Sequence, residues 1–174
     1  MNINSELRIA VLAAMLLIAL YTDWRWRKIF NNLTFPCMAT GIILNVLDGR
    51  LGGFLSSIGG AALVIALFLV LAPAAGIGGG DTKLMVAVGA IMGLHFTVSA
   101  LIYTGLAGGI LALIVMARHR VMVRTTRSLF VNLYSKAVLN APINLATGGS
   151  GIKFKYSLAI VVGTVLAFVR PIWN

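Results

Sequence analysis

The sequence is dominated by long apolar runs separated by short clusters of charged residues. Hydrophobic residues make up 60% of the 174-residue chain and charged residues only 10%, whereas a soluble domain carries about 25% charged residues. So few polar groups cannot cover a water-facing surface of this size. The pattern therefore predicts an all-α polytopic membrane protein, folded as one membrane-embedded domain over residues 1–174.

The apolar runs predict a bundle of about six transmembrane helices. Their expected positions are residues 7–22, 33–47, 52–72, 84–92, 95–117 and 156–169, and the fourth of them is short. Asp48-Gly49-Arg50 predicts a turn between the second and third helices. Pro73 predicts the end of the third, because proline removes a backbone hydrogen bond inside a helix.

Lysine and arginine are concentrated on one side of this six-helix layout. Of the 14 cations, three (Arg8, Arg50 and Arg170) fall on the outer side, which leaves 14 − 3 = 11 on the side of the first loop. Cytoplasmic loops carry the excess of positive charge in membrane proteins. Both termini are thus expected on the outer side of the membrane. The net charge of +10 is explained by this orientation and does not predict a nucleic-acid partner.

The four acidic residues separate into two pairs by the same topology. Asp23 and Asp81 fall on the cytoplasmic side, and Glu6 and Asp48 fall outside. Two facing carboxylates at one membrane depth cannot both ionise cheaply, so one keeps its proton while the other stays charged. Such a pair can activate a water and protonate the leaving amine of a peptide bond.

Nearby cations offer a purely structural alternative for the cytoplasmic pair. Each acid could form an ion pair with Arg25, Arg27 or Lys83. Lys83 could also tune the pKa of Asp81 or anchor its helix at headgroup level, and we favour the anchor.

A glycine-rich stretch precedes Asp81. Four glycines within residues 76–80 weaken a helix by roughly 1 kcal/mol each relative to alanine. They also allow another backbone to approach closely, so an extended substrate could reach the acid. A flexible hinge is the alternative. The spacings Gly89-x-x-x-Gly93 and Gly105-x-x-x-Gly109 predict close helix packing and no chemistry.

The remaining candidate residues indicate no further site. His95 is expected on the outer side, away from both acids, and His119 lies in a basic segment over residues 118–155. The part of that segment up to Lys136 is either an amphipathic element on the anionic leaflet or a solvated loop. Cys37 has no CxxC partner and is expected as a buried apolar residue, and no residue spacing predicts a metal site.

Two aspartate motifs resemble those of the type IV prepilin peptidases. Residues 78–83, Gly-Gly-Gly-Asp-Thr-Lys, match the family's GxGDxK motif through Gly78, Gly80, Asp81 and Lys83. Residues 23–31 resemble its other motif, an aspartate followed by basic residues and Ile-Pro-Asn, with Phe30 in place of the proline. Near the last helix, Lys155-Tyr156-Ser157 lacks the proline often found before the family's tyrosine.

The resemblance implies an aspartic endopeptidase with Asp23 and Asp81 as the catalytic residues and no cofactor. Members of the family remove the short basic leader of prepilin-like proteins at the cytoplasmic face of the inner membrane, after a glycine, and serve pilus assembly or secretion machinery. The chain looks most similar to the small branch of Flp or Tad pili, so methyltransferase activity is not expected. A proton-coupled transporter and a non-catalytic assembly subunit of a secretion system are the alternatives.

Overall fold

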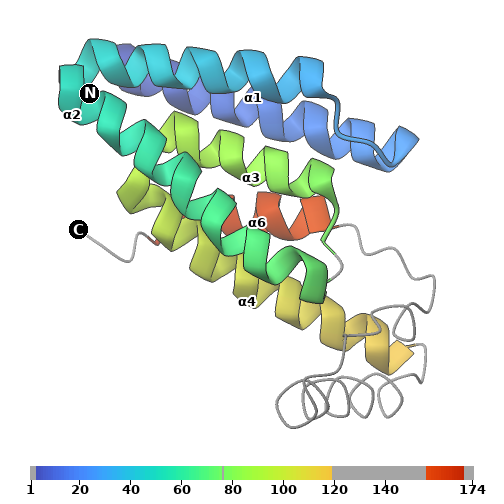
Figure 1. Cartoon of the computed structure of the whole chain (residues 1–174). Helices are drawn as coiled ribbons and strands as arrows, with labels where there is room; N and C mark the ends of the chain where they lie inside the picture. Colours follow the sequence, from blue (N-terminus) through green and yellow to red (C-terminus); the bar gives the residue numbers. More distant parts are fainter. Residues whose placement is uncertain (1–2, 76, 119–155, 171–174) are drawn as a thin grey trace, which may run out of the picture. The chain divides into compact units, whose positions relative to one another are not determined.

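The computed structural model describes residues 3–75, 77–118 and 156–170, and this part of the chain is helical throughout, with no strand (Figure 1). The helices are α1 (Ile3–Trp26), α2 (Asn31–Ala75), α3 (Gly79–Met92), α4 (Leu94–Arg118) and α6 (Tyr156–Val169). The all-α prediction is confirmed for these residues. The predicted basic segment lies outside them, apart from Arg118.

The chain divides into two compact units. The first combines residues 1–108 with residues 155–174, and the second covers residues 109–154. Helices α1, α2, α3 and α6 belong to the first unit, as does α4 up to Gly108. Of the second unit only the end of α4 is described. Both predicted catalytic aspartates lie in the first unit, and the prediction of a single domain stays a prediction.

Helix α2 is broken at Arg50 into two arms. Arg50 has φ 48° and ψ −124°, a left-handed conformation that costs about 1 kcal/mol for a residue with a Cβ. The change of direction therefore falls within the predicted turn at residues 48–50, and Figure 1 shows the second arm running back from it at an angle to the first. The second arm ends at Ala75, so the predicted helix end at Pro73 is two residues too early.

Three of the described helices have the length and composition of a membrane span. They are Ile3–Trp26, Asn31–Leu71 and Leu94–Ile114. The two arms of α2, residues 31–49 and 51–75, are about 28 and 38 Å long, so each alone has a length close to the ~30 Å hydrocarbon layer. Helices α3 and α6 have 14 residues each, or about 21 Å. The six-span count and the side of each terminus stay predictions.

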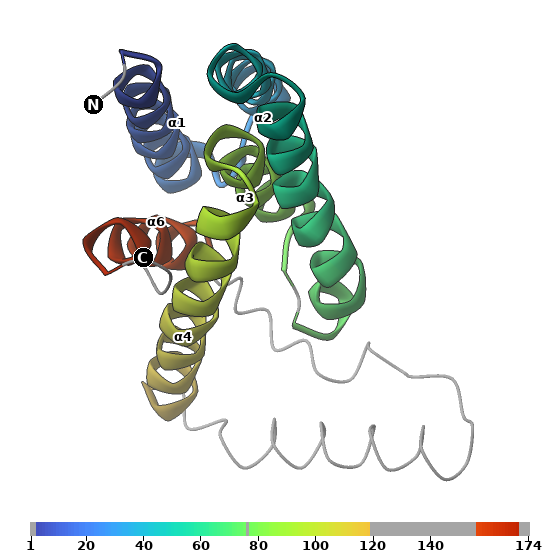
Figure 2. The same cartoon turned by 90° about the vertical axis from the view of Figure 1, so that its left-hand side faces the viewer.

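Helix α3 forms the centre of the first unit. Every residue from Leu84 to Ile91 is buried, and Figure 2 shows α3 lying between α1, α2 and α6. Apolar side chains of the three surrounding helices complete the core: Leu12, Met15, Leu16, Ala19, Val64, Phe68, Ile160 and Ala167. A helix buried on all sides fits the continuous apolar run that predicted it.

Close backbone contact between α2 and α3 confirms the predicted packing of Gly89. A Cβ at Gly89 would lie 2.7 Å from the carbonyl oxygen of Gly60, and one at Gly60 would lie 2.5 Å from the carbonyl oxygen of Gly89. Gly93 ends α3 with φ 80°, and a Cβ there would lie 2.4 Å from Ser56 Oγ. Glycine is required at both positions because the second arm of α2 lies directly against them.

The packing prediction is not confirmed at Gly105. No described residue lies within 4 Å of a Cβ built at Gly105, whereas one at Gly163 of α6 would lie 2.3 Å from Thr104 Oγ1 and one at Gly108 would lie 2.8 Å from the Tyr156 ring. The face of α4 that meets α6 thus begins one residue earlier than the glycine spacing suggested. One residue turns a helix face by about 100°, and a spacing of small residues does not reveal which face has a neighbour.

A network of polar side chains holds the C-terminal end of α3. The buried Asn45 side chain donates from Nδ2 to the carbonyl oxygens of Ile91 (2.8 Å) and Ala90 (3.3 Å). Ser57 Oγ donates to the Ala90 oxygen at 2.6 Å. Carbonyls in the last turn of a helix have no partner within the helix, so these side chains of α2 cap α3.

The same network contains an ion pair between α1 and α2. Arg8 and Asp48 are 2.8 Å apart, Arg8 also donates to Asn45 Oδ1 at 2.5 Å, and Asn4 Nδ2 donates to Asp48 Oδ1 at 2.7 Å. We call these residues, together with Ser57, the Arg8–Asp48 network. It joins α1, α2 and α3 at the end of the first unit that contains the N-terminus of α1.

Candidate active site

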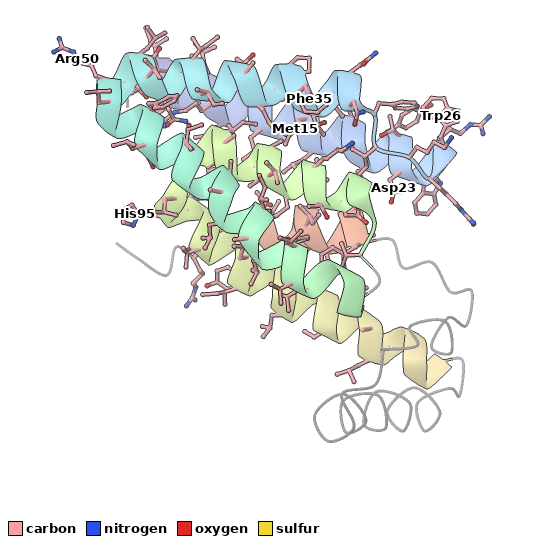
Figure 3. All side chains as sticks on the ribbon, viewed as in Figure 1. Met15, Asp23, Trp26, Phe35, Arg50 and His95 are labelled. Carbon is pink, nitrogen blue, oxygen red and sulfur yellow. The ribbon has the colours of Figure 1, made fainter. Side chains whose placement is uncertain are left out.

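Asp23 lies in the last turn of α1, which continues for three residues beyond it. The helix ends at Trp26, and Arg27, with φ 53°, donates its N–H to the Asp23 carbonyl oxygen at 3.0 Å. This left-handed residue closes the helix end. The side chain of Asp23 is half-buried, and Figure 3 shows Asp23 and Trp26 at one end of the helices and Arg50 and His95 at the opposite end. His95 is therefore distant from Asp23, as expected.

Ser157 of α6 is the hydrogen-bond partner of the Asp23 carboxylate. Its hydroxyl donates to Asp23 Oδ2 at 2.5 Å, and the residue is fully buried, with 0% of its surface exposed. Sequence analysis did not identify Ser157 as a site residue, because 134 positions separate the two partners. One signal was available: it is a polar residue in the first turn of the last predicted helix, on the membrane face assigned to both acids.

Asp81 lies in the first turn of α3, which begins at Gly79. Gly78 is the N-cap residue, in an extended conformation (φ −70°, ψ 148°), and a Cβ there would lie 3.4 Å from Asp81 Oδ2. The Asp81 carboxylate therefore lies close to the backbone of the N-cap residue. An acidic side chain is favourable in the first turn, because the N–H groups there have no partner within the helix.

The glycines before Asp81 start a helix. Gly79 and Gly80 are the first two residues of α3. A Cβ at Gly80 would lie 3.3 Å from Cβ of Ile29, whereas one at Gly79 would meet no described residue within 4 Å. The segment that approaches Gly80 is thus the connection between α1 and α2, which follows Asp23. Whether the glycines also admit a substrate stays a prediction.

The cations near the site do not form ion pairs with the two acids in the described part of the chain. Lys83 Nζ donates to Asn31 Oδ1 at 2.9 Å, which ties the start of α3 to the start of α2. Arg25 lies over the Trp26 ring, 5.9 Å from its centre. The structural alternative, in which each acid is neutralised by Arg25, Arg27 or Lys83, is not what these residues show.

A pocket of about 380 Å³ contains both aspartates. Its walls come from the last turn of α1, the connection to α2 and the first turn of α3. The lining residues are Asp23, Arg27, Lys28, Ile29, Phe30, Asn31, Gly78, Gly80 and Asp81. Residues of both sequence motifs are therefore brought to one place. Among the residues that the structure describes, no group of three histidine, cysteine or acidic side chains could hold a metal ion.

The pKa of Asp81 is raised from 3.8 to about 6. Asp81 lies outside the three helices of membrane length. Burial is the largest cause, since it disfavours the charged carboxylate, and the negative charge of Asp23 raises the pKa further. The hydrogen bond from Gly78 acts in the opposite direction. A carboxyl with a pKa near 6 can hold a proton or release it close to neutral pH, which is what acid–base chemistry requires.

Phe30 occupies the position where the resembling motif has proline. Its carbonyl oxygen accepts the N–H groups of Leu33 (3.1 Å) and Thr34 (3.3 Å) and so begins α2. Its ring packs edge-on against Trp26, with the centres 6.0 Å apart. The connection between the two helices is thus closed by backbone hydrogen bonds and an aromatic contact.

Comparison with known proteins agrees with the motifs. The family model of the type IV leader peptidase family matches residues 10–113, a range that contains both aspartates and more than half of the chain. The chain belongs to this family, and its membership implies a membrane peptidase. Searches of curated proteins and of solved structures gave no match.

Proposed function

We propose that this protein is an aspartic endopeptidase that removes the leader of prepilin-like proteins at the cytoplasmic face of a bacterial inner membrane. The observation that carries the proposal is one pocket that contains Asp23 and Asp81 from two different helices, in a chain of the leader peptidase family. Ionisable groups in membrane helices are rare and mark functional sites. A perturbed carboxyl in a pocket is a candidate for acid–base chemistry.

The proposed reaction uses the two carboxyl groups as one acid–base pair. One carboxylate takes a proton from a water molecule as the water oxygen attacks the scissile carbonyl carbon. The other carboxyl group gives its proton to the leaving amine as the C–N bond breaks. The raised pKa of Asp81 supports a division into one acid and one base, because two nearby carboxyl groups can share one proton. No cofactor enters this scheme.

The motif residues Gly78, Gly80 and Lys83 have positioning roles in this proposal. Gly78 caps α3 and lies beside the Asp81 carboxylate. Gly80 admits the connection that follows Asp23, and Lys83 binds Asn31 at the rim of the pocket. All three act on the distance and orientation between the two acids. Substrate choice, the Flp or Tad branch, the pilus or secretion partners and the absence of methylation are part of the same proposal and rest on the motifs.

The two alternative functions have no observation in their favour. A proton-coupled transporter needs ionisable groups along a path through the membrane depth. All four acids of the chain are described; of them, Asp48 is paired with Arg8, Glu6 lies in the first turn of α1, and the other two share the pocket. A non-catalytic assembly subunit would tolerate the loss of both pocket acids, so the test below separates it from a peptidase.

The test is cleavage of a pilin-like protein from the same genome, co-expressed with the wild-type chain, Asp23→Asn, Asp81→Asn or Glu6→Gln. Glu6 is an exposed acid on the same helix as Asp23 and serves as the matched control. We expect each of the first two variants to leave the substrate uncut at wild-type membrane abundance, and Glu6→Gln to cut normally. Full cleavage by well-expressed Asp23→Asn or Asp81→Asn would refute the proposal.

A further inference from the structure

We propose that Ser157 is a positioning residue that holds Asp23 as the charged, water-activating member of the aspartate pair. This inference rests on the proposed function and adds to it an assignment of the two acids to different roles. It is carried by the hydrogen bond from Ser157 Oγ to Asp23 Oδ2 at 2.5 Å. A hydroxyl that donates to a carboxylate stabilises its charged form.

The packing of α6 fixes the position of the Ser157 hydroxyl. Ser157 is fully buried and lies in the first turn of α6. Its neighbour Tyr156 packs edge-on against Phe68 of α2, with ring centres 6.4 Å apart, and Gly163 of the same helix touches Thr104 of α4. The hydroxyl is therefore presented to Asp23 from a buried position on a helix that packs against α2 and α4.

The surroundings of Asp23 and Asp81 differ in a way that suits this assignment. Asp81 has a raised pKa of about 6, so it takes up a proton as the pH falls from neutral and suits the role of the acid. Among the described residues, Arg27, Lys28 and Asp81 line the pocket with Asp23, and Tyr156, next to Ser157 on α6, is acted on by the charge of Asp81. Ser157 is uncharged, buried and hydrogen-bonded to one defined oxygen of Asp23.

The assignment specifies where each proton goes. The Asp23 carboxylate takes one proton from water, and the water oxygen forms a bond with the scissile carbonyl carbon. Protonated Asp81 then gives its proton to the amine nitrogen as the C–N bond breaks, which leaves a carboxyl on the leader and a new amino terminus on the substrate. Asp23 returns its proton to Asp81, so one water is consumed and the pair is restored.

The experiment measures kcat/KM against pH for purified wild type, Ser157→Ala and Ser157→Thr on a peptide that spans the leader junction. Ser157→Ala removes a hydrogen bond to a charged group, so we expect kcat to fall about 10–100-fold with little change in KM. The acidic limb of the profile should move to higher pH, because protonation of the pair becomes easier. Ser157→Thr keeps a hydroxyl and should recover most of the rate.

Thr164→Ala is the matched control on the same helix. The Thr164 hydroxyl is buried and donates to the Ile160 carbonyl oxygen at 2.7 Å, away from both acids. Its removal should leave the pH profile in place. A Ser157→Ala profile that coincides with that of the wild type, or one that falls equally at every pH, would overturn the inference. If Ser157→Thr has a lower melting temperature than the wild type, the inference is judged from the pH profile of Ser157→Ala alone.

Asp23→Asn and Asp81→Asn in the same assay separate this inference from the proposed function. If both variants lose cleavage while Ser157→Ala keeps the wild-type profile, only the role of Ser157 is wrong. If either aspartate variant keeps the wild-type rate, or the wild type does not cut, the proposed function fails and the inference fails with it.

Discussion

The two ends of the first unit contain aspartates in opposite situations. At one end Asp48 is held by Arg8 at 2.8 Å and by Asn4 at 2.7 Å. At the other end Asp23 and Asp81 line one pocket and form no ion pair within the described ranges. Both sets lie at helix ends of the same small bundle, and two things distinguish them. Asp48 has a cationic partner, whereas Asp81 is partly buried beside a second acid.

The comparison separates a structural acid from acids that remain available for chemistry. The charge of Asp48 is compensated by a guanidinium, and the network around it joins three helices. Asp81, by contrast, has a pKa raised by burial and by Asp23, which means that its charged form is disfavoured in the folded protein. Functional groups are often kept in such costly surroundings. We therefore expect the Arg8–Asp48 network to contribute stability and the aspartate pair to reduce it.

Removal of Arg8 should give the largest loss of stability. Arg8→Ala leaves Asp48 without its cation and Asn45 without a donor, and we expect the free energy of unfolding to fall by about 2–3 kcal/mol, below the full cost of breaking a buried pair because both side chains are partly exposed. Unfolding in mixed micelles measures it. In a double-mutant cycle Asp48→Ala should add little to Arg8→Ala; additive losses would contradict the coupling.

Removal of the Asn45 amide should lower the free energy of unfolding slightly less than removal of Arg8. Asn45→Ala leaves the Ala90 and Ile91 carbonyl oxygens with fewer partners at the buried end of α3, a loss of about 2 kcal/mol. Because α3 also contains Asp81, the variant tests whether the two ends are coupled. We expect a lower melting temperature and a rate per folded molecule within about threefold of the wild type. A loss of rate with an unchanged melting temperature would show that Asn45 acts on the aspartate pair and not on stability.

The pH dependence of the free energy of unfolding should distinguish Asp81 from Asp48, with a smaller effect than the two substitutions above. The folded-state pKa of Asp81 is about 6, above its ordinary 3.8, so the folded protein binds a proton between pH 4 and 6 that the unfolded chain does not. The free energy of unfolding therefore falls as the pH rises through this range, by about 1–2 kcal/mol after discounting for solvent screening. Asp81→Asn should lack this fall and should be more stable than the wild type at pH 8.

Asp48→Asn is the control for that measurement, since it removes a compensated charge and should be less stable than the wild type at pH 8. Thermal melts in detergent at pH 4, 6 and 8 measure both variants. If Asp81→Asn is less stable than the wild type at pH 8, the carboxyl is a structural group and the comparison between the two ends is wrong.

The smallest effect is expected at neighbouring glycines. A Cβ at Gly80 would lie 3.3 Å from Ile29, and one at Gly79 would meet no described residue within 4 Å. Gly80→Ala should push the connection after Asp23 away by a few tenths of an ångström and lower the rate several-fold. Gly79→Ala should keep the rate and gain up to about 0.5 kcal/mol, because alanine favours a helix. Equal rates for the two variants would show that Gly80 does not position the site.

Much of the helix layout could be predicted because apolar runs with clear ends determine it. Residues 156–169 form the predicted last helix, and α4 extends one residue beyond its predicted range at each end. The predicted third-helix end at Pro73 failed because a proline in the final turn removes only one backbone hydrogen bond. The Gly105 packing is not confirmed among the described residues, and the glycine spacing carries no information on which helix face is occupied.

The candidate site was predictable in its acids and in the motif residues next to them. Composition and charge placed Asp23 and Asp81 on one membrane face, and the structure brings both to one pocket. The side-chain partners of the aspartates were not predicted at either end of the first unit. Ser157 is 134 positions from Asp23, and Arg8 pairs with Asp48 across 40 positions. Single side-chain contacts between distant segments depend on how the helices pack, and a single sequence does not contain that register.

The most direct test measures kcat/KM on a leader-junction peptide for purified Asp23→Asn, Asp81→Asn and Asp48→Asn at pH 7. General acid–base groups contribute about 10²–10⁴-fold each, so the first two variants should lose at least about 100-fold while they keep a native melting profile. Asp48→Asn should stay within about threefold of the wild type per folded molecule. Rates within tenfold of the wild type for either pocket variant, or an equal loss in Asp48→Asn, would contradict the division between a catalytic pair and a structural acid.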